Sequence, residues 1–381
     1  MYIVRNIEKQ VRELAKQYPF VAVTGPRQSG KTTLVKTVFK DYDYVSLEEL
    51  DNREFATRDP RGFIATYPKK VIIDEVQRVP NLLSYLQVHA DTVGAEGMYI
   101  LTGSQNFSLI QAIDQSLAGR VALMTLLPLS HDEIVRGGLC SKTVDEEMFR
   151  GCFPRIYNKG ISPTTFYSNY TKTYVERDIR TLKNITDLST FVRFLKLCAG
   201  RIGQLLNMSS LANDCGVSVP TVKAWISALE ASYVIMLLKP DYNNFSKRLV
   251  KTPKLYFCDT GLACSLLEIT SAKQLATHYL RGGLFENLVI VDYLKNALNE
   301  GRTPEMSFWR DNNGNEVDLL IRENGIQQAV EIKSGQTYNS DFFKGLKYWS
   351  QLSGATIEST TVIYAGDNSF QTSDGLLKAW R

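Results

Sequence analysis

Five short apolar runs recur through about the first 135 residues, and segments with helical spacing of apolar residues separate them. The runs cover residues 20–24, 44–47, 70–74, 98–102 and 121–126. Strands that alternate with helices predict a parallel sheet with helices on both faces. Ligands bind such sheets at the carboxyl ends of the strands, so the polar residues that follow each run are the first candidates for a site.

The middle of the chain has a helical pattern from residue 166 to about residue 206, and a predicted helix-turn-helix follows it. Gly216 suits the tight turn between two short helices, and Ser218 suits the cap of the second helix. Strand-like runs at residues 233–238 and 254–257 come next. A helix-turn-helix followed by two strands predicts a winged helix.

The last third of the chain predicts a second α/β region that begins with an amphipathic helix at residues 283–298. The elements expected after it are strands at residues 307–310, 316–321 and 329–333, a helix at 342–349 and a final strand at 360–364. Apolar runs of this length, separated by polar turns, are typical of strands in a sheet.

Composition narrows the class of protein. The 381 residues suffice for two or three domains, and 44% hydrophobic against 22% charged residues exclude a disordered chain. The net charge of +4 is too small to indicate nucleic-acid binding by itself. No run of about 18 apolar residues predicts a membrane helix, and the N-terminus lacks the apolar core of a signal peptide.

Cysteine and histidine usage agrees with a cytoplasmic protein without a zinc site. The six cysteines are scattered without a C-x-x-C pair, which is the usage of a reducing compartment. The three histidines lie far apart along the chain, which argues against zinc. We therefore expect a cytoplasmic location and no membrane partner.

The segment that follows the first apolar run reads G-P-R-Q-S-G-K-T and matches G-x-x-x-x-G-K-[ST], the phosphate-binding loop (P-loop) of nucleotide hydrolases. Backbone N–H groups and the N-terminus of the following helix offer a nest for phosphates. Lys31 suits the β- and γ-phosphates, and the Thr32 hydroxyl suits Mg²⁺. The predicted nucleotide contacts of the loop are Gly25, Pro26, Arg27, Gln28, Ser29, Gly30, Lys31, Thr32 and Thr33.

Two carboxylates follow the third apolar run. We expect Asp74 to bind Mg²⁺ directly or through water and Glu75 to polarise the attacking water, because one acid must neutralise charge while the other accepts a proton. The fourth run ends in T-G-S-Q, which can place a hydroxyl or amide between these carboxylates and the γ-phosphate. Thr102, Ser104 and Gln105 are all candidates for this sensor, and the sequence does not choose among them.

Arg120 precedes the fifth apolar run and has two interpretations. It is either a surface arginine or an arginine that senses the γ-phosphate, in its own subunit or in a neighbouring one. The sequence does not decide between these roles.

Taken together, the P-loop, D-E-V-Q-R-V-P at residues 74–80, L-T-G-S-Q at 101–105 and L-A-G-R-V at 117–121 resemble the AAA-type ATPases of the prokaryotic family that carries the DUF4143 domain. The resemblance covers nearly the whole chain. It implies a Mg²⁺-dependent ATPase with an AAA-like core, in which the sensor strand lies between the P-loop strand and the acidic strand.

Four charged residues of the C-terminal third resemble the core of PD-(D/E)xK nucleases. They are Glu286 on the predicted helix, Asp318 on one strand, and Glu331 with Lys333 on the next. Asp318 and Glu331 can converge on a Mg²⁺ that binds a scissile phosphate, and Glu286 can add a further metal contact. Alternation along the strand puts Glu331 and Lys333 on one face, where Lys333 can orient or activate water. All four residues are present, so the sequence leaves cleavage open.

We therefore predict an α/β protein with four regions. Residues 1–137 form the AAA-like P-loop domain, 138–204 a helical linker or lid, 205–262 a winged-helix-like domain, and 263–381 a nuclease-like domain of the restriction-endonuclease type. The DUF4143 region is expected at about residues 170–335.

The sequence allows two classes of binding partner, nucleic acid and protein. Residues 239–254 hold five basic residues and one acid, with Tyr242 and Phe245 between them, which suits a DNA or RNA backbone. Winged helices attached to ATPases also serve as docking elements for proteins. The chain is therefore either an ATPase that drives a DNA-binding and cleaving half, or an ATP-dependent switch or scaffold that binds a partner protein or a second copy of itself.

Overall fold

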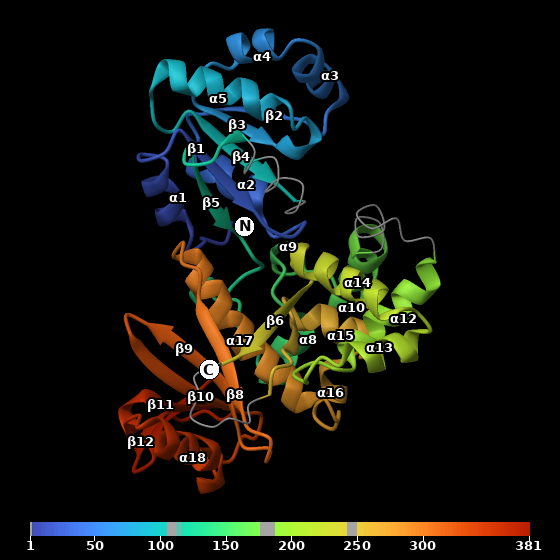
Figure 1. Ribbon diagram of the computed structural model, residues 1–381, viewed down its shortest axis with the longest axis vertical. Helices are drawn as coiled ribbons and strands as arrows, with labels where there is room; N and C mark the ends of the chain where they lie inside the picture. Colours follow the sequence, from blue (N-terminus) through green and yellow to red (C-terminus); the bar gives the residue numbers. More distant parts are fainter. Residues whose placement is uncertain (1, 105–112, 114–115, 176–186, 242–249) are drawn as a thin grey trace.

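The computed structural model describes residues 2–104, 113, 116–175, 187–241 and 250–381, and it contains two sheets with helices around them (Figure 1). The sheet near the N-terminus has five parallel strands, and the second sheet has eight strands of mixed direction. The predicted α/β class is confirmed. No helix within these residue ranges is long and apolar enough to cross a bilayer.

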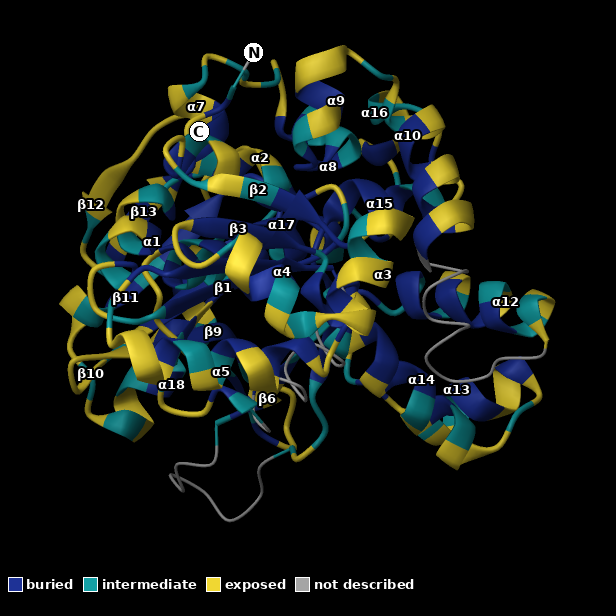
Figure 2. Cartoon of the chain, turned by 90° about the horizontal axis from the view of Figure 1, so that it is seen from above, coloured by how far each residue is buried: buried dark blue, intermediate teal, exposed yellow. Residues whose placement is uncertain are grey.

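The N-terminal sheet is apolar at consecutive strand positions because helices cover both of its faces. Its strands are β1 (Phe20–Thr24), β2 (Asp43–Ser46), β3 (Val71–Asp74), β4 (Tyr99–Gly103) and β5 (Val121–Thr125), in the order β2-β3-β4-β1-β5. Its helices are α1 (Glu8–Leu14), α2 (Lys31–Val38), α3 (Leu50–Arg58), α4 (Pro60–Thr66), the 3₁₀ turn η1 (Val76–Arg78) and α5 (Leu82–Val93). Phe20 and Ala22 pack on the side of α3, α4 and α5, and Val21 and Val23 pack on the side of α1 and α2. Figure 2 shows strands β1 and β3 buried while the outer sides of α3 and α4 are exposed.

The middle region is mainly helical, as predicted. Its elements are α7 (His131–Arg136), α8 (Val144–Arg150), α9 (Pro154–Lys159), α10 (Pro163–Tyr170), the π-helical turn η2 (Thr171–Val175), α12 (Leu188–Ala199), α13 (Met208–Cys215), α14 (Val219–Ala231), β6 (Ile235–Pro240), β7 (Lys254–Phe257), α15 (Thr260–Leu266) and α16 (Ala272–Leu275). The predicted helix-turn-helix is present. Gly216 ends α13 with a φ of 73°, and the Ser218 side chain accepts a hydrogen bond from the Thr221 N–H at the start of α14. Tyr242 and Phe245 lie outside the described residues.

The strands of the predicted wing belong to the C-terminal sheet. β6 pairs with β7 in antiparallel fashion and with β8 in parallel fashion, so the sheet has the order β12-β13-β11-β10-β9-β8-β6-β7. The remaining elements are α17 (Arg281–Asn299), β8 (Glu305–Arg310), β9 (Glu316–Glu323), β10 (Ile326–Lys333), η3 (Ser340–Phe343), α18 (Lys344–Ser353), η4 (Ile357–Ser359), β11 (Thr360–Tyr364), β12 (Phe370–Thr372) and β13 (Gly375–Ala379). The prediction that residues 360–364 form the final strand is wrong, because β12 and β13 follow and extend the sheet beyond β11.

The middle region and α17 share one apolar core with the C-terminal sheet. Leu262 packs in the same cluster as Leu284 of α17 and Phe308 of β8, so a common core continues across residue 262. On the other face of the sheet, Trp349 of α18 packs in a separate cluster with Trp309. The C-terminal sheet is therefore covered by helices on both sides.

Candidate functional site

The P-loop joins the end of β1 to the start of α2, and its backbone requires glycine. Gly25 and Gly30 have φ angles of 141° and 98°, and a Cβ on Gly25 would collide with the carbonyl oxygen of Leu126. These conformations are accessible to glycine and strained for other residues. The buried Ser29 hydroxyl has no hydrogen-bond partner in the described part of the chain. The loop thus has the curved backbone and an unsatisfied polar group that a bound anion would suit.

Lys31, the first residue of α2, lies buried against the loop. Its ammonium donates hydrogen bonds to the carbonyl oxygens of Gly25, at 2.9 Å, and Pro26, at 2.8 Å. Burial lowers the pKa of Lys31 to about 8, although the charges of Glu75 and Asp74 oppose this shift. The carbonyl oxygens of the loop therefore occupy the ammonium group to which an anionic ligand would bind.

Asp74 lies at the end of β3, and its carboxylate accepts hydrogen bonds from three hydroxyl groups. It accepts hydrogen bonds from Thr32 Oγ1 at 3.1 Å, from the Tyr44 hydroxyl at 2.8 Å and from the Thr102 hydroxyl. Thr32 and Asp74, both of which the sequence predicts to bind Mg²⁺, thus lie within hydrogen-bond distance of each other. An oxygen-rich pair of this kind matches the ligands that Mg²⁺ prefers.

Glu75 follows the last residue of β3 and has a left-handed backbone with a φ of 57°, which is uncommon for a residue other than glycine. Its carboxylate accepts hydrogen bonds from Ser104 Oγ, at 3.0 Å, and from the Gln77 side-chain amide. β4 lies between β1 and β3, as the resemblance implied. Of the three sensor candidates, Thr102 contacts Asp74, Ser104 contacts Glu75, and Gln105 lies outside the described residues.

Glu75 and Ser104, together with the P-loop, line a cavity of about 590 Å³ whose second wall belongs to the middle region. Gly30, Lys31 and Thr32 line one side of it, and Arg155 and Lys159 of α9 line the other. The sequence reasoning missed both α9 residues. Their spacing of four residues, which places two cations on one helix face, was a weak signal that could have drawn attention to them.

Arg5 supports the P-loop from the N-terminal segment and was also missed. Its guanidinium donates to the carbonyl oxygens of Ser29, at 2.9 Å, and Leu127, at 2.7 Å, and forms an ion pair with Glu133 at 3.0 Å. Both side chains of the ion pair are buried. A single arginine near the start of a chain carries no motif, so the sequence offered no signal for this role.

Arg120 lies at the opposite end of the sheet from the P-loop. Its carbonyl accepts from the N–H of Phe20, the first residue of β1, whereas the P-loop follows the last residue of that strand. Its guanidinium pairs with Asp91 of α5 at 2.6 Å. The structure therefore does not bring Arg120 to the nucleotide site of its own chain, and we do not include it in that site.

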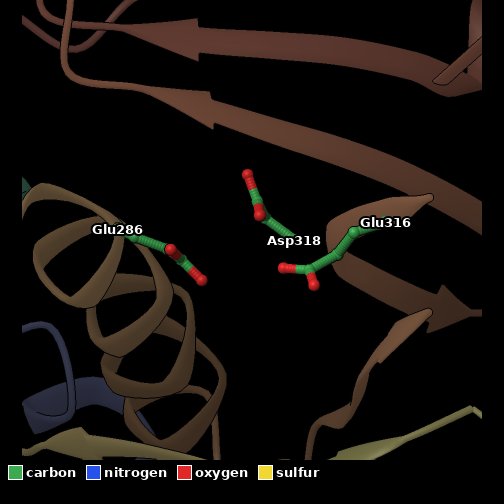
Figure 3. Close-up of side chains that lie close together, drawn as sticks. All are labelled: Glu286, Glu316 and Asp318. Atoms are coloured by element: carbon green, nitrogen blue, oxygen red, sulfur yellow. The ribbon is translucent and has the colours of Figure 1, made fainter. Parts of the chain in front are cut away.

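A second charged cluster joins α17 to the C-terminal sheet. Figure 3 shows Glu286 reaching from α17 toward Glu316 and Asp318 of β9, and one oxygen of each lies within 4.8 Å of the others. The predicted metal set named Glu286, Asp318 and Glu331, whereas the structure brings Glu316 into this group in place of Glu331. Glu316 stands two residues before Asp318 on the same strand face, a signal that alternation along a strand could have given.

Lys254 fills the middle of this cluster. Its ammonium pairs with Glu286 at 2.8 Å and with Glu316, and lies 3.8 Å from Asp318. The Tyr256 hydroxyl donates a hydrogen bond to the same Glu286 oxygen. The sequence reasoning placed Lys254 in the basic wing, but only 2% of its side chain is exposed, so it is not available to a nucleic-acid backbone.

Glu331 and Lys333 lie next to this cluster on β10 and bond to each other. Lys333 Nζ lies 2.5 Å from Glu331 Oε1, and Asp318 accepts a hydrogen bond from the Ile332 N–H at 2.8 Å. Burial and the charge of Asp318 raise the pKa of Glu331 to about 8, and the same two causes raise that of Glu286 to about 7. The four predicted residues are thus in one region of the fold, engaged mainly with groups of the protein.

Comparison with known families divides the chain into three matched segments. An AAA domain matches residues 17–135, a domain of unknown function called DUF8612 matches residues 141–273, and the DUF4143 domain matches residues 281–380. The resemblance drawn from the motifs is confirmed: the chain carries an AAA-type ATPase domain and a DUF4143 domain. The DUF4143 match lies further toward the C-terminus than the expected range of about 170–335, and DUF8612 was not predicted.

Whole-chain relatives are also found. The chain is 28% identical over 374 residues to the uncharacterized protein Rv2008c of Mycobacterium tuberculosis and, to the same extent, to the uncharacterized protein Mb2031c of Mycobacterium bovis. Each alignment covers 97% of this chain and 82% of the relative.

Similar solved structures include a Walker-type ATPase, PABY2304 of Pyrococcus abyssi, with 13% identity and a TM-score of 0.39 over 68% of this chain and 94% of that one. AMPPCP-bound DnaA from Aquifex aeolicus matches with 12% identity and a TM-score of 0.28 over 59% of this chain and 85% of that one.

Proposed function

We propose that the AAA domain binds ATP with Mg²⁺ and hydrolyses it. The observation that carries this proposal is the convergence of Lys31, Thr32 and Glu75 on one cavity of about 590 Å³, with Asp74 bonded to Thr32 behind it. The residues present fit the ligand. A glycine-dependent loop and the Ser29 hydroxyl, which has no partner among the described residues, suit phosphates, and the Thr32–Asp74 pair suits a hard cation.

In the proposed reaction, Lys31 exchanges the carbonyls of Gly25 and Pro26 for the β- and γ-phosphates. Thr32 and Asp74 would hold Mg²⁺, which neutralises charge that develops on the phosphates. Glu75 would orient the attacking water and accept its proton. Ser104 donates to the carboxylate of Glu75 and lines the cavity, so we assign the sensor role to it, while Thr102 bonds to Asp74.

Two substitutions test this function. Lys31→Ala should abolish ATP binding, and Glu75→Gln should keep ATP bound while it lowers the rate of phosphate release by about 100-fold or more. Binding is measured by calorimetry and turnover by phosphate release. Lys69→Ala, an exposed lysine before the opposite end of β3, is the matched control and should leave both unchanged. Normal turnover in both site variants would overturn the assignment.

For the C-terminal half, we propose the second of the two classes: an ATP-dependent switch or scaffold that binds a partner protein without cleaving nucleic acid. The ion pairs of Lys254 within the acidic cluster support this choice. A switch also needs a contact between the middle region and the P-loop domain. Tyr233 of the middle region supplies one, because its hydroxyl lies 3.3 Å from Thr24 Oγ1 and 3.2 Å from Thr125 Oγ1. Six unpaired cysteines support the cytoplasmic location.

The two classes differ in a plasmid assay. The protein is incubated with plasmid and Mg²⁺, with and without ATP, and wild type is compared with Lys333→Ala. We expect intact plasmid in every case and an ATPase rate that DNA does not stimulate. Cleavage that depends on Lys333, or salt-sensitive DNA binding, would instead favour the first class.

A further inference from the structure

The acidic cluster of Glu286, Glu316 and Asp318 surrounds a positively charged side chain of the protein itself, Lys254. The Lys254 ammonium lies 2.8 Å from Glu286 Oε1 and 3.8 Å from Asp318 Oδ1, and it also pairs with Glu316 Oε1. With 2% of its side chain exposed, Lys254 is screened from water. Three carboxylates from two elements thus face one buried positive charge.

A divalent cation would need the same oxygen atoms. Mg²⁺ and Ca²⁺ bind carboxylate oxygens at about 2.0–2.6 Å, and a metal at that distance would lie in contact with the Lys254 ammonium and be repelled by it. The other oxygen of Glu316 is engaged as well, because Oε2 pairs with Arg310 at 2.8 Å. The Tyr256 hydroxyl bonds to the Glu286 oxygen that faces Lys254. These residues do not fit the metal that the nuclease resemblance implies.

The neighbouring E-x-K strand has a similar arrangement. Glu331 Oε1 is paired with Lys333 at 2.5 Å, and Asp318 Oδ2 accepts from the Ile332 N–H at 2.8 Å. Four carboxylates of this region therefore face three cationic side chains, Lys254, Lys333 and Arg310. Even with every carboxylate ionised, this balance leaves little negative charge for a divalent cation to neutralise, and protonation of any of them would leave less.

We propose that Lys254 takes the place of a metal ion in this nuclease-like core and that the cluster is an ion-pair link between the middle region and the C-terminal domain. Lys254 lies on β7, in the segment matched by DUF8612, whereas its three partners lie on α17 and β9 of the DUF4143 segment. A buried ion pair that loses one partner leaves an uncompensated charge, so the link holds the two segments in one arrangement. The inference deepens the non-cleaving role proposed above and does not depend on ATP hydrolysis.

Metal binding by the full chain tests this proposal. Binding of Mn²⁺ is measured by calorimetry and electron paramagnetic resonance without nucleotide, and every protein carries Asp74→Asn so that the P-loop contributes no metal site. The parent protein should bind no Mn²⁺ that saturates below about 1 mM. Lys254→Met, which removes the ammonium, should bind one Mn²⁺ in that range, and Asp318→Asn added to it should abolish the binding. Lys239→Met, an exposed lysine on the adjacent strand β6, is the matched control and should behave like the parent.

Each outcome decides the matter. The proposal is overturned if the parent binds one Mn²⁺ that Asp318→Asn removes, or if Lys254→Met is folded by circular dichroism and binds none. If Lys254→Met does not fold, Lys254→Gln replaces it and is judged by the same criteria. The measurement on the parent protein tests the proposal whether or not either variant folds. Inactive ATPase in otherwise normal protein would overturn the function proposed for the P-loop and leave this result untouched.

Discussion

At the scale of single residues, Arg5 shows how a buried charge can position a loop without touching its ligand. It binds the Ser29 carbonyl of the P-loop and pairs with Glu133, which is fully buried. Arg5→Ala would leave Glu133 charged and unpaired, so we expect the free energy of unfolding to fall by about 3 kcal/mol and ATP affinity to fall with it. Urea unfolding and calorimetry measure the two effects.

The double variant separates the positioning role of Arg5 from its part in stability. Adding Glu133→Gln to Arg5→Ala should restore much of the stability, because the unpaired charge is gone, but should not restore ATP affinity, because the Ser29 carbonyl stays unsupported. If stability and affinity recover together, Arg5 acts only through folding. Lys40→Ala, an exposed residue beyond α2, should change neither quantity.

The residues that the sequence revealed are those whose partners lie in a short motif. Lys31, Thr32, Asp74 and Glu75 were predictable because the P-loop and the end of an acidic strand are contiguous patterns with a known physical purpose. Arg5 was not predictable, since its partner Glu133 is 128 positions away. Lys254 was misplaced for the same reason: its charge could be counted, but its burial depends on how β7 packs against α17 and β9.

At the scale of elements, the junction of α7 and α8 has a pH-dependent ion pair. His131, the first residue of α7, lies 2.7 Å from Glu147 of α8. Burial lowers the pKa of His131, but the hydrogen bond and the charge of Glu147 outweigh it, so the pKa is raised above the usual value of 6.5. A raised histidine pKa stabilises the fold fully below about pH 6.5, and this contribution is lost as the pH rises through the folded-state pKa.

His131→Gln tests this junction, because glutamine retains hydrogen-bonding groups and carries no charge. Wild type should be the more stable protein at pH 5.5, by an amount on the order of 1 kcal/mol, and this advantage should shrink as the pH rises above 6.5. Urea unfolding from pH 5.5 to 8.5 measures it. Glu147→Gln should remove the same pH dependence. A difference that is constant across this range would contradict the ion-pair interpretation.

Element positions were largely predictable because apolar runs between polar turns mark buried strands. The run at residues 20–24 coincides with β1 and the run at 360–364 with β11. β12 and β13 were missed because they lie near the edge of the sheet and contain no run of buried residues: β12 has two exposed residues and one half-buried residue, and β13 alternates buried and exposed positions. These strands are defined by their pairing, β13 with β11 and β12 with β13, more than by a run of buried apolar residues.

At the scale of the whole molecule, the order of the regions was predictable but their contacts were not. β6 follows the helix-turn-helix and pairs with β8, so the winged region and the C-terminal sheet are one continuous structure. The middle region also reaches the P-loop region, through Tyr233 at the last residue of β1 and through α9 across the cavity. These contacts depend on surfaces that meet only after folding, and no spacing along the chain encodes them.

The α9 contact leads to a prediction about how nucleotide binding reaches the rest of the molecule. Arg155 and Lys159 are exposed in the cavity that Lys31 and Glu75 also line. ATP bound there would bring its phosphates between the P-loop and α9, and each charge-assisted hydrogen bond formed is worth about 1.5–3 kcal/mol. Arg155→Ala should therefore weaken ATP binding by roughly tenfold or more, and ADP binding by less, because ADP lacks the γ-phosphate.

Calorimetry with ATP and with ADP separates this effect from a general loss of affinity. Lys172→Ala removes an exposed lysine of the same region outside the cavity and should leave both affinities unchanged. Equal weakening for the two nucleotides would place Arg155 near the base or the shared phosphates rather than at the γ-phosphate. Unchanged affinity in the double variant Arg155→Ala and Lys159→Ala would show that α9 only walls the cavity, and coupling would then have to pass through Tyr233.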